Sequence, residues 1–148
     1  MTVVKVERTL HHPPEHVFNF VASNHFQNHP RWDPDLLEMN QTSPGPVQVG
    51  TTAHVVRRQG RRIVEGTATV TEYQPNRRAS WDVEFGPFRL RQRADLVPEN
   101  DGMATRLQLS VDTRARGPIK VIVPLLRGRF RKTMEQSLAT ISALLDHT

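Results

Sequence analysis

The sequence contains no cysteine among its 148 residues. This absence excludes disulfide bonds, thiolate metal sites and a cysteine nucleophile, and it suits the reducing cytosol. The longest apolar run, from Val121 to Leu126, is far shorter than the ~20 residues that span a bilayer. The first ten residues alternate apolar and polar side chains, unlike the apolar core of a signal peptide. We therefore expect a cytoplasmic protein.

Several catalytic signatures are also missing. The sequence has no glycine-rich phosphate loop, no dinucleotide-binding fingerprint and no nucleophile elbow. Kinase, hydrolase and dehydrogenase functions therefore lack support, and we expect no cofactor. The net charge is only +5, from 20 Lys and Arg against 15 Asp and Glu. This surplus is compatible with an anionic ligand, a membrane surface or nucleic acid, and also with an ordinary solvated surface.

The length of the chain predicts a single domain spanning residues 1–148. Residues 3–10 alternate as a strand does, and the prolines that follow suit the start of a short helix with one apolar face. A second short helix is predicted over residues 26–32, where Asp33 and Pro34 end it. Further strands are predicted over residues 36–39 and 105–112.

Gly86 and Pro87 predict the loop of a tight hairpin. Glycine followed by proline suits a type II′ turn, which needs positive φ only at its first position. With this loop, apolar residues oppose one another on one face and opposite charges meet on the other. A slip of one residue would destroy both patterns. The predicted pairs are Phe85–Phe88, Val83–Leu90 and Trp81–Gln92 on one face, and Glu84–Arg89 and Asp82–Arg91 on the other.

Gln59 and Gly60 predict a second two-residue loop. The hairpin around it is apolar on both faces near the turn, so the pattern does not say which face is buried. The predicted pairs are Val55–Val64, Ala53–Gly66, Val56–Ile63 and His54–Glu65.

The final segment predicts a long helix. Gly117 and Pro118 open it, and Pro124 should kink the helix or break off its first turn. Beyond Pro124, apolar residues recur every three or four positions and form one stripe. A helix cannot bury such a stripe alone, so the sheet must supply the matching apolar face, which makes the fold class α+β. The stripe consists of Leu126, Phe130, Met134, Leu138, Ile141 and Leu145.

The elements follow one another as a strand, two short helices, a run of antiparallel strands and one long helix. Several short sequence motifs accompany this order of elements. They are Val17-Phe18, Asn28 through Trp32-Asp33-Pro34, residues 45–51, and Val70-Thr71-Glu72-Tyr73 with Pro75. Over essentially the whole chain, this combination resembles the START-related superfamily, in its polyketide cyclase/dehydrase and lipid-transfer branch.

The resemblance implies a helix-grip fold. In this fold a curved antiparallel sheet of about six or seven strands wraps around a long C-terminal helix, with two short helices after the first strand. It also implies an internal cavity between the sheet and the last helix. It implies no catalytic residue, because the superfamily shares none, so the function must be argued from the site.

The implied cavity predicts binding of an apolar or aromatic small molecule, lipid-like or polyketide-like. Gln92 is the polar exception on an apolar face and would orient the ligand. The alternative is that the same side chains simply fill the core. The candidate ligand-binding residues are Trp81, Val83, Phe85, Phe88, Leu90, Gln92, Phe130, Met134, Leu138 and Ile141.

His54 opposite Glu65 gives an alternative function. A carboxylate beside an imidazole can hold its orientation and raise its basicity, and a cyclase or dehydratase needs such a proton shuttle. The pair is equally compatible with a surface contact between strands, in which case it has little energetic importance. The hypothesis requires both side chains to point into the cavity.

Seven histidines raise the question of a metal site. His25 and His29 are spaced as i and i+4, with Asp33 one turn further, but no complete ligand set is recognisable, and we expect no metal. Basic residues suggest a third function, a membrane-surface or protein-interaction module. No aromatic residues are interleaved for base stacking, so we expect no nucleic-acid partner, and the oligomeric state stays open. The basic residues are Arg57, Arg58, Arg61, Arg62, Arg127, Arg129, Arg131 and Lys132.

Overall fold

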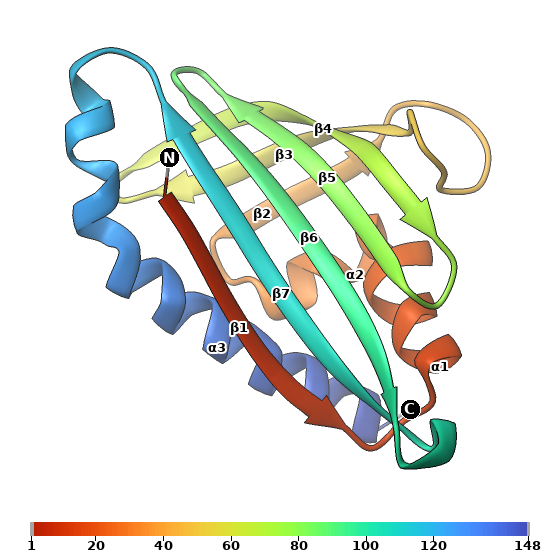
Figure 1. Ribbon diagram of the computed structural model, residues 1–148. Helices are drawn as coiled ribbons and strands as arrows, with labels where there is room; N and C mark the ends of the chain where they lie inside the picture. The colour runs from red at the N-terminus through yellow and green to blue at the C-terminus, as the bar shows by residue number, and fades with distance from the viewer. Residues whose placement is uncertain (1, 148) are drawn as a thin grey trace.

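The computed structural model describes residues 2–147 and is built on one seven-stranded antiparallel sheet (Figure 1). The strand order is β1-β7-β6-β5-β4-β3-β2, so the first strand of the chain lies beside the last. The sheet curves around a long helix, as predicted for an α+β fold of this type. The strands are β1 (Thr2–Leu10), β2 (Leu36–Gln41), β3 (Thr52–Gln59), β4 (Arg62–Gln74), β5 (Arg78–Phe85), β6 (Phe88–Glu99) and β7 (Ala104–Ala115).

The helices fall into two groups. The predicted short helices after β1 are α1 (Pro14–Phe18), which continues into the π-helical turn η1 (Asn19–Ser23), and α2 (His25–Trp32). A short 3-10 turn, η2 (Asn100–Gly102), joins β6 to β7. After β7 come two 3-10 turns, η3 (Gly117–Val121) and η4 (Val123–Leu126), and the long helix α3 (Arg127–Asp146). The break predicted at Pro124 is therefore confirmed, because the regular helix begins only at Arg127.

The predicted register of the β5–β6 hairpin is confirmed. Phe85 pairs with Phe88 across the loop, and Trp81 pairs with Gln92. Gly86 has a φ of 50°, as the first position of this turn requires. Asp82 on the other face forms an ion pair with Arg91.

The predicted register of the β3–β4 hairpin is wrong by two residues. The loop is Gly60-Arg61, and Val55 pairs with Gly66 rather than with Val64. A shift of two leaves every side chain on its original face, so the apolar pattern could not detect it. Glycine takes the first loop position, where its φ is 61°. The structure also identifies the inner face of β3, since Ala53 and Val55 are buried.

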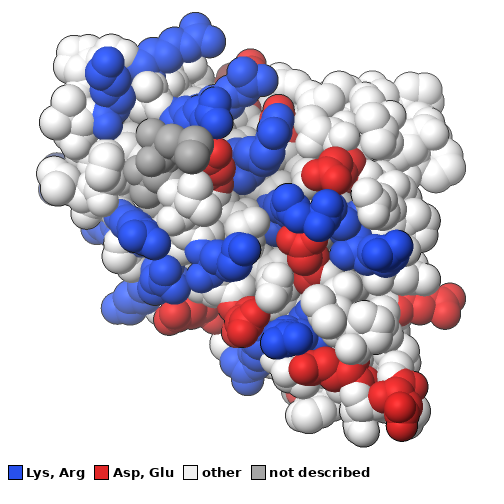
Figure 2. All heavy atoms as spheres, viewed as in Figure 1, with Lys and Arg blue, Asp and Glu red and all other residues white. Residues whose placement is uncertain are grey.

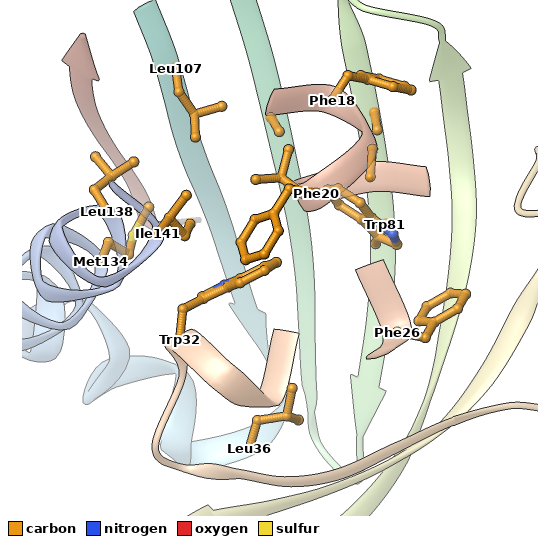
Figure 3. Close-up of a cluster of buried hydrophobic side chains, with 14 of the residues drawn as sticks. Phe18, Phe20, Phe26, Trp32, Leu36, Trp81, Leu107, Met134, Leu138 and Ile141 are labelled. Carbon is orange, nitrogen blue, oxygen red and sulfur yellow. The ribbon is translucent and has the colours of Figure 1, made fainter. Parts of the chain in front are cut away.

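Helix α3 packs its apolar stripe against the concave face of the sheet. Leu138, Ile141 and Leu145 are buried, and Met134 is nearly so, whereas Phe130 is half-buried. Figure 3 shows Met134, Leu138 and Ile141 on the side of the core opposite Trp81 and Phe26. Within residues 2–147, no helix is long and apolar enough to cross a membrane.

Gly66 generates a prediction about stability. A Cβ atom at this position would overlap the Glu84 carbonyl oxygen and crowd the Phe85 ring, because β5 passes close to β4 there. We expect Gly66→Ala to lower the free energy of unfolding by roughly 1–3 kcal/mol, the usual range for overpacking. Urea denaturation measures the change.

Gly128→Ala is the matched control. This glycine lies in α3, and a Cβ atom added there would meet nothing within 4 Å, so alanine should raise stability by up to about 1 kcal/mol. Equal effects of the two substitutions would contradict the close contact between β4 and β5.

Candidate functional site

A cavity of about 550 Å³ lies between the sheet and α3. Its walls come from α2, from the loop end of β3, from β5, β6 and β7, and from α3. Most of the side chains predicted to bind a ligand line this cavity. They are Trp81, Phe88, Leu90, Gln92, Phe130, Met134 and Ile141.

Three predicted ligand-binding residues do not line the cavity. Val83, Phe85 and Leu138 have exposures of 3%, 3% and 2%. They pack into the closed part of the core, so their burial is explained without a ligand. The alternation of the strand correctly placed Val83 and Phe85 on the inner face, but it could not show where along that face the cavity ends.

His54 and Glu65 also lie outside the cavity. Their side chains approach within 3.5 Å as an ion pair, but they are 42% and 70% exposed. Because successive side chains of a strand alternate, the inward direction of Ala53 and Val55 turns His54 outward. The condition for an acid/base function, that both side chains point inward, is not met.

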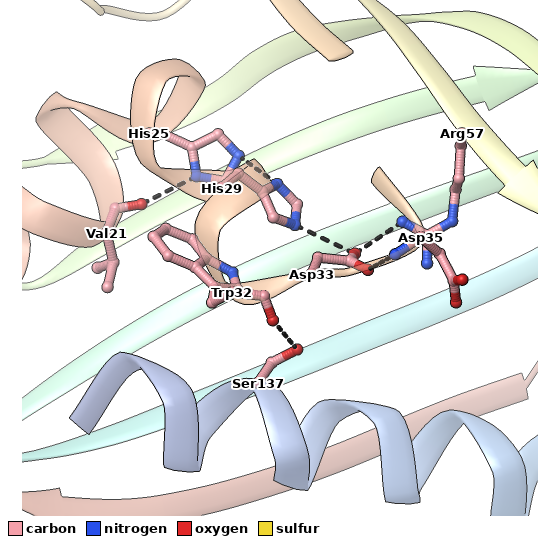
Figure 4. A network of polar contacts seen from close by, with 8 residues as sticks. All are labelled: Val21, His25, His29, Trp32, Asp33, Asp35, Arg57 and Ser137. Carbon is pink, nitrogen blue, oxygen red and sulfur yellow. Dashed lines mark hydrogen bonds and ion pairs between the residues drawn. The ribbon is translucent and has the colours of Figure 1, made fainter. Parts of the chain in front are cut away.

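A buried chain of polar side chains lines the cavity instead, and Figure 4 shows its course. His25 Nδ1 lies 2.9 Å from the Val21 carbonyl oxygen, and His25 Nε2 lies 3.1 Å from His29 Nδ1. His29 Nε2 is 3.5 Å from Asp33 Oδ2, to which Arg57 donates a hydrogen bond of 2.7 Å. The chain thus runs from the backbone of η1 through α2 to the inner face of β3.

The signal for this chain is present in the sequence. His25, His29 and Asp33 are spaced as i, i+4 and i+8, which places them on one face of a helix and its C-terminal extension. Taken alone, that spacing suggests only an incomplete metal site. Sequence reasoning missed the role of Arg57 because nothing local in β3 indicates its partner. Among residues 2–147, no group of three or more potential ligand residues is arranged to hold a metal ion.

The geometry indicates where the protons of the two imidazoles lie. The Val21 carbonyl can only accept, so His25 Nδ1 donates to it. A proton also lies between His25 Nε2 and His29 Nδ1. Because a neutral imidazole carries one N–H, a neutral His25 accepts at Nε2 the hydrogen bond that His29 Nδ1 donates.

Burial and charge act in opposite directions along the chain. Burial, together with the neighbouring His29, holds the pKa of His25 well below its ordinary value, so His25 is a neutral imidazole at neutral pH. Burial alone would raise the pKa of Asp33, but the contacts with His29 and Arg57 outweigh it and hold that pKa far below 3.8. Asp33 is therefore an anion held beside the Arg57 guanidinium and the His29 imidazole.

Aromatic contacts also hold the two histidines of the polar chain in place. The His25 ring stacks on Trp81 with centroids 4.1 Å apart, and His29 stacks on Trp32 at 5.2 Å. The Trp32 carbonyl accepts a hydrogen bond of 3.1 Å from the Ser137 hydroxyl, which ties α2 to α3. The polar chain is thus held rigidly in the wall between the two helices.

Comparison with known families identifies the fold. The chain matches the polyketide cyclase/dehydrase and lipid transport family over residues 1–146. It belongs to this family. Members of the family are described by cyclisation, dehydration or lipid transport, so membership supports a site for small hydrophobic molecules without choosing among these functions. A search of curated proteins finds no match.

Solved structures confirm the helix-grip fold of this family member. TTHA0849 from Thermus thermophilus has a TM-score of 0.78 at 16% identity, with 97% of each chain covered. A START superfamily protein from Mycobacterium smegmatis has a TM-score of 0.76 at 16% identity, covering 98% of this chain and 97% of that one. A norcoclaurine synthase point mutant from Thalictrum flavum, in complex with a transition-state analogue, has a TM-score of 0.71 at 14% identity, covering 99% and 94%.

The hydrogen bonds of the two imidazoles predict an NMR result. In ¹⁵N-labelled protein at neutral pH, His25 should carry its proton on Nδ1, with Nε2 unprotonated, because Nδ1 donates to the Val21 carbonyl and Nε2 accepts from His29 Nδ1. A His25 ring protonated on Nε2 and not on Nδ1 would contradict the hydrogen-bond assignment.

The lowered pKa of Asp33 predicts a pH dependence of stability. Because the folded state binds the Asp33 proton less tightly than the unfolded state, its stabilising effect is present above pH 3.8 and is lost as the pH falls below that value. Removing one partner of a buried ion pair costs about 3–5 kcal/mol, so Asp33→Asn should lower stability by about that amount at neutral pH. Denaturant titrations should show this difference narrowing in acid, and a constant difference would contradict the ion pair.

Proposed function

We propose that this protein binds an apolar or aromatic small molecule, lipid-like or polyketide-like, in the cavity between the sheet and α3. The observation that carries the proposal is the cavity itself, whose volume of about 550 Å³ lies in the range of small-molecule sites. Burying roughly 300 Å² of ligand surface would contribute about 7 kcal/mol before the cost of association. Aromatic and aliphatic side chains on the sheet and on α3 support an apolar ligand body, while polar side chains on other parts of the wall leave room for a polar end.

Gln92 and Arg57 are the polar groups that orient the ligand in this proposal. Both line the cavity, from different strands of the sheet. Arg57 is already anchored by its hydrogen bond to Asp33, so its remaining donors have a fixed direction. A ligand with an apolar body and one polar end therefore matches the distribution of side chains.

The positions of the histidines support binding rather than acid/base chemistry. Both ring nitrogens of His25 and of His29 are engaged within the buried chain, so neither ring has a free nitrogen for a substrate. His54 and Glu65 lie on the outer face. Under this proposal the buried chain positions Arg57 and stiffens the cavity wall.

Filling the cavity tests the proposal. The uncharged fluorescent probe N-phenyl-1-naphthylamine should bind the protein and brighten in the apolar site. Val111, which lines the cavity on β7, is replaced by phenylalanine. We expect Val111→Phe to weaken probe binding at least about tenfold, because the added ring takes up volume that the probe needs.

Val3→Phe is the matched control, since Val3 lies on the neighbouring strand β1 but is 42% exposed. It should leave probe binding unchanged. Circular dichroism establishes that both variants fold. Equal probe binding by the Val111 and Val3 variants would overturn the assignment of the cavity as the binding site.

A further inference from the structure

The cavity opens to the surface between two segments that are far apart in the sequence. Arg58 and Gly60 at the β3–β4 loop line it on one side, and Arg129 at the start of α3 lines it on the other. All three residues are exposed, so the cavity reaches solvent between them. We name these borders the hairpin lip (residues 58–63) and the helical lip (residues 116–129).

Both lips are basic and lack acidic residues. Between residues 115 and 134 the sequence has no Asp or Glu, and the same holds between residues 54 and 64. Figure 2 shows Lys and Arg predominating at the end of the molecule where Figure 1 draws η3 and the loop end of β7, whereas Asp and Glu gather towards the opposite end. The exposed basic residues of the lips are Arg58, Arg61, Arg62, Arg116, Lys120, Arg127 and Arg129.

Exposed apolar side chains protrude from the same lips. Leu125 is 81% exposed, Val121 is 70% exposed, and Ile122 is 51% exposed, all in the helical lip. Ile63, in the hairpin lip, is 66% exposed. Among the described residues, only two other large apolar side chains are more than half exposed, Val49 and Met103.

The helical lip is anchored to the rest of the protein by inward-facing side chains. Val123 is 3% exposed, and Leu126 faces the cavity, so the segment is anchored while Val121, Ile122 and Leu125 project outward. Its two 3-10 turns each begin with a proline near the first position, which restricts the backbone. The apolar side chains are therefore presented on a fixed support.

We propose that the two lips form a docking surface for a bilayer that contains anionic phospholipids. Lys and Arg side chains pair with lipid phosphates, while Val121, Ile122 and Leu125 enter the boundary between headgroups and acyl chains. Docking places the opening of an apolar cavity against the membrane. The proposal does not depend on the identity of the cavity's ligand.

The charges of the lips favour a bilayer over other partners. Two copies of this chain meeting lip to lip would bring like charges together, which opposes association. Nucleic acid would require aromatic side chains for stacking, but the exposed lip residues are aliphatic or basic. An anionic bilayer satisfies both the positive charge and the exposed aliphatic side chains.

Vesicle co-sedimentation tests the docking surface. The protein should bind vesicles of phosphatidylcholine with phosphatidylglycerol, bind pure phosphatidylcholine vesicles much less, and lose binding as salt rises. Lys120→Gln with Arg127→Gln should weaken binding at least about tenfold, since each basic residue near an anionic surface contributes about fivefold. Arg8→Gln with Arg77→Gln, two exposed residues outside the lips, should have little effect.

Insertion of the apolar side chains has a separate test. Because the chain has no cysteine, Leu125→Cys gives a single site for a nitrobenzoxadiazole dye. The dye emission should shift to the blue when anionic vesicles are added. The same dye at Met103→Cys, a position where the native side chain is 68% exposed outside the lips, should not shift.

Three results would overturn the proposal. They are equal binding by the lip and control charge variants, an unshifted dye at position 125 on bound vesicles, and a stable dimer in light scattering that binds no vesicles. The cavity probe separates this proposal from the ligand proposal, because the lip variants should bind N-phenyl-1-naphthylamine as the unsubstituted protein does.

Discussion

The contact between α3 and the sheet is the constraint on which the rest of the structure depends. Burial along the stripe falls towards the N-terminal end of the helix: Ile141 and Leu145 are fully buried, Met134 is 9% exposed, and Phe130 is only half-buried. Helix and sheet therefore touch at one end and separate at the other. Since a straight helix cannot follow a curved sheet along its whole length, the separation is a property of the fold, and the cavity lies where the contact ends.

The buried polar chain lies in the region where α3 and the sheet separate. A fully closed core would leave His25, His29 and Asp33 without the partners that charged and polar groups need. Here α2 lies in the space between the sheet and α3, so its polar face meets Arg57 on one side and the cavity on the other. Contacts with Arg57 and His29 stabilise the carboxylate, which makes the charged form of Asp33 compatible with burial. The resulting wall is stiff, because aromatic stacking and charge contacts hold the same residues.

Sequence patterns predicted the elements and one hairpin register well, and long-range contacts poorly. The β5–β6 register followed from two independent patterns, apolar pairs on one face and charge pairs on the other. The β3–β4 register failed because a shift of two residues preserves the faces; the distinction lies in the turn, where Gly60 takes the first loop position with a positive φ. Seven of the proposed cavity residues line the cavity, since the faces of β5, β6 and α3 were predicted correctly. Arg57 was missed because its partner, Asp33, lies 24 residues away.

The distribution of charge connects the interior to the surface. Within the core the buried carboxylate of Asp33 is neutralised by its neighbours, and on the β5–β6 face the arginines are paired with Asp82 and Asp95. The lips differ, since their basic residues lie in segments without any Asp or Glu. Ion pairs at a surface change the stability of the fold little. A cluster of like charges, by contrast, destabilises the folded chain through mutual repulsion. A cluster placed where apolar side chains also protrude, at the opening of the cavity, matches an anionic, partly apolar surface in both charge and polarity.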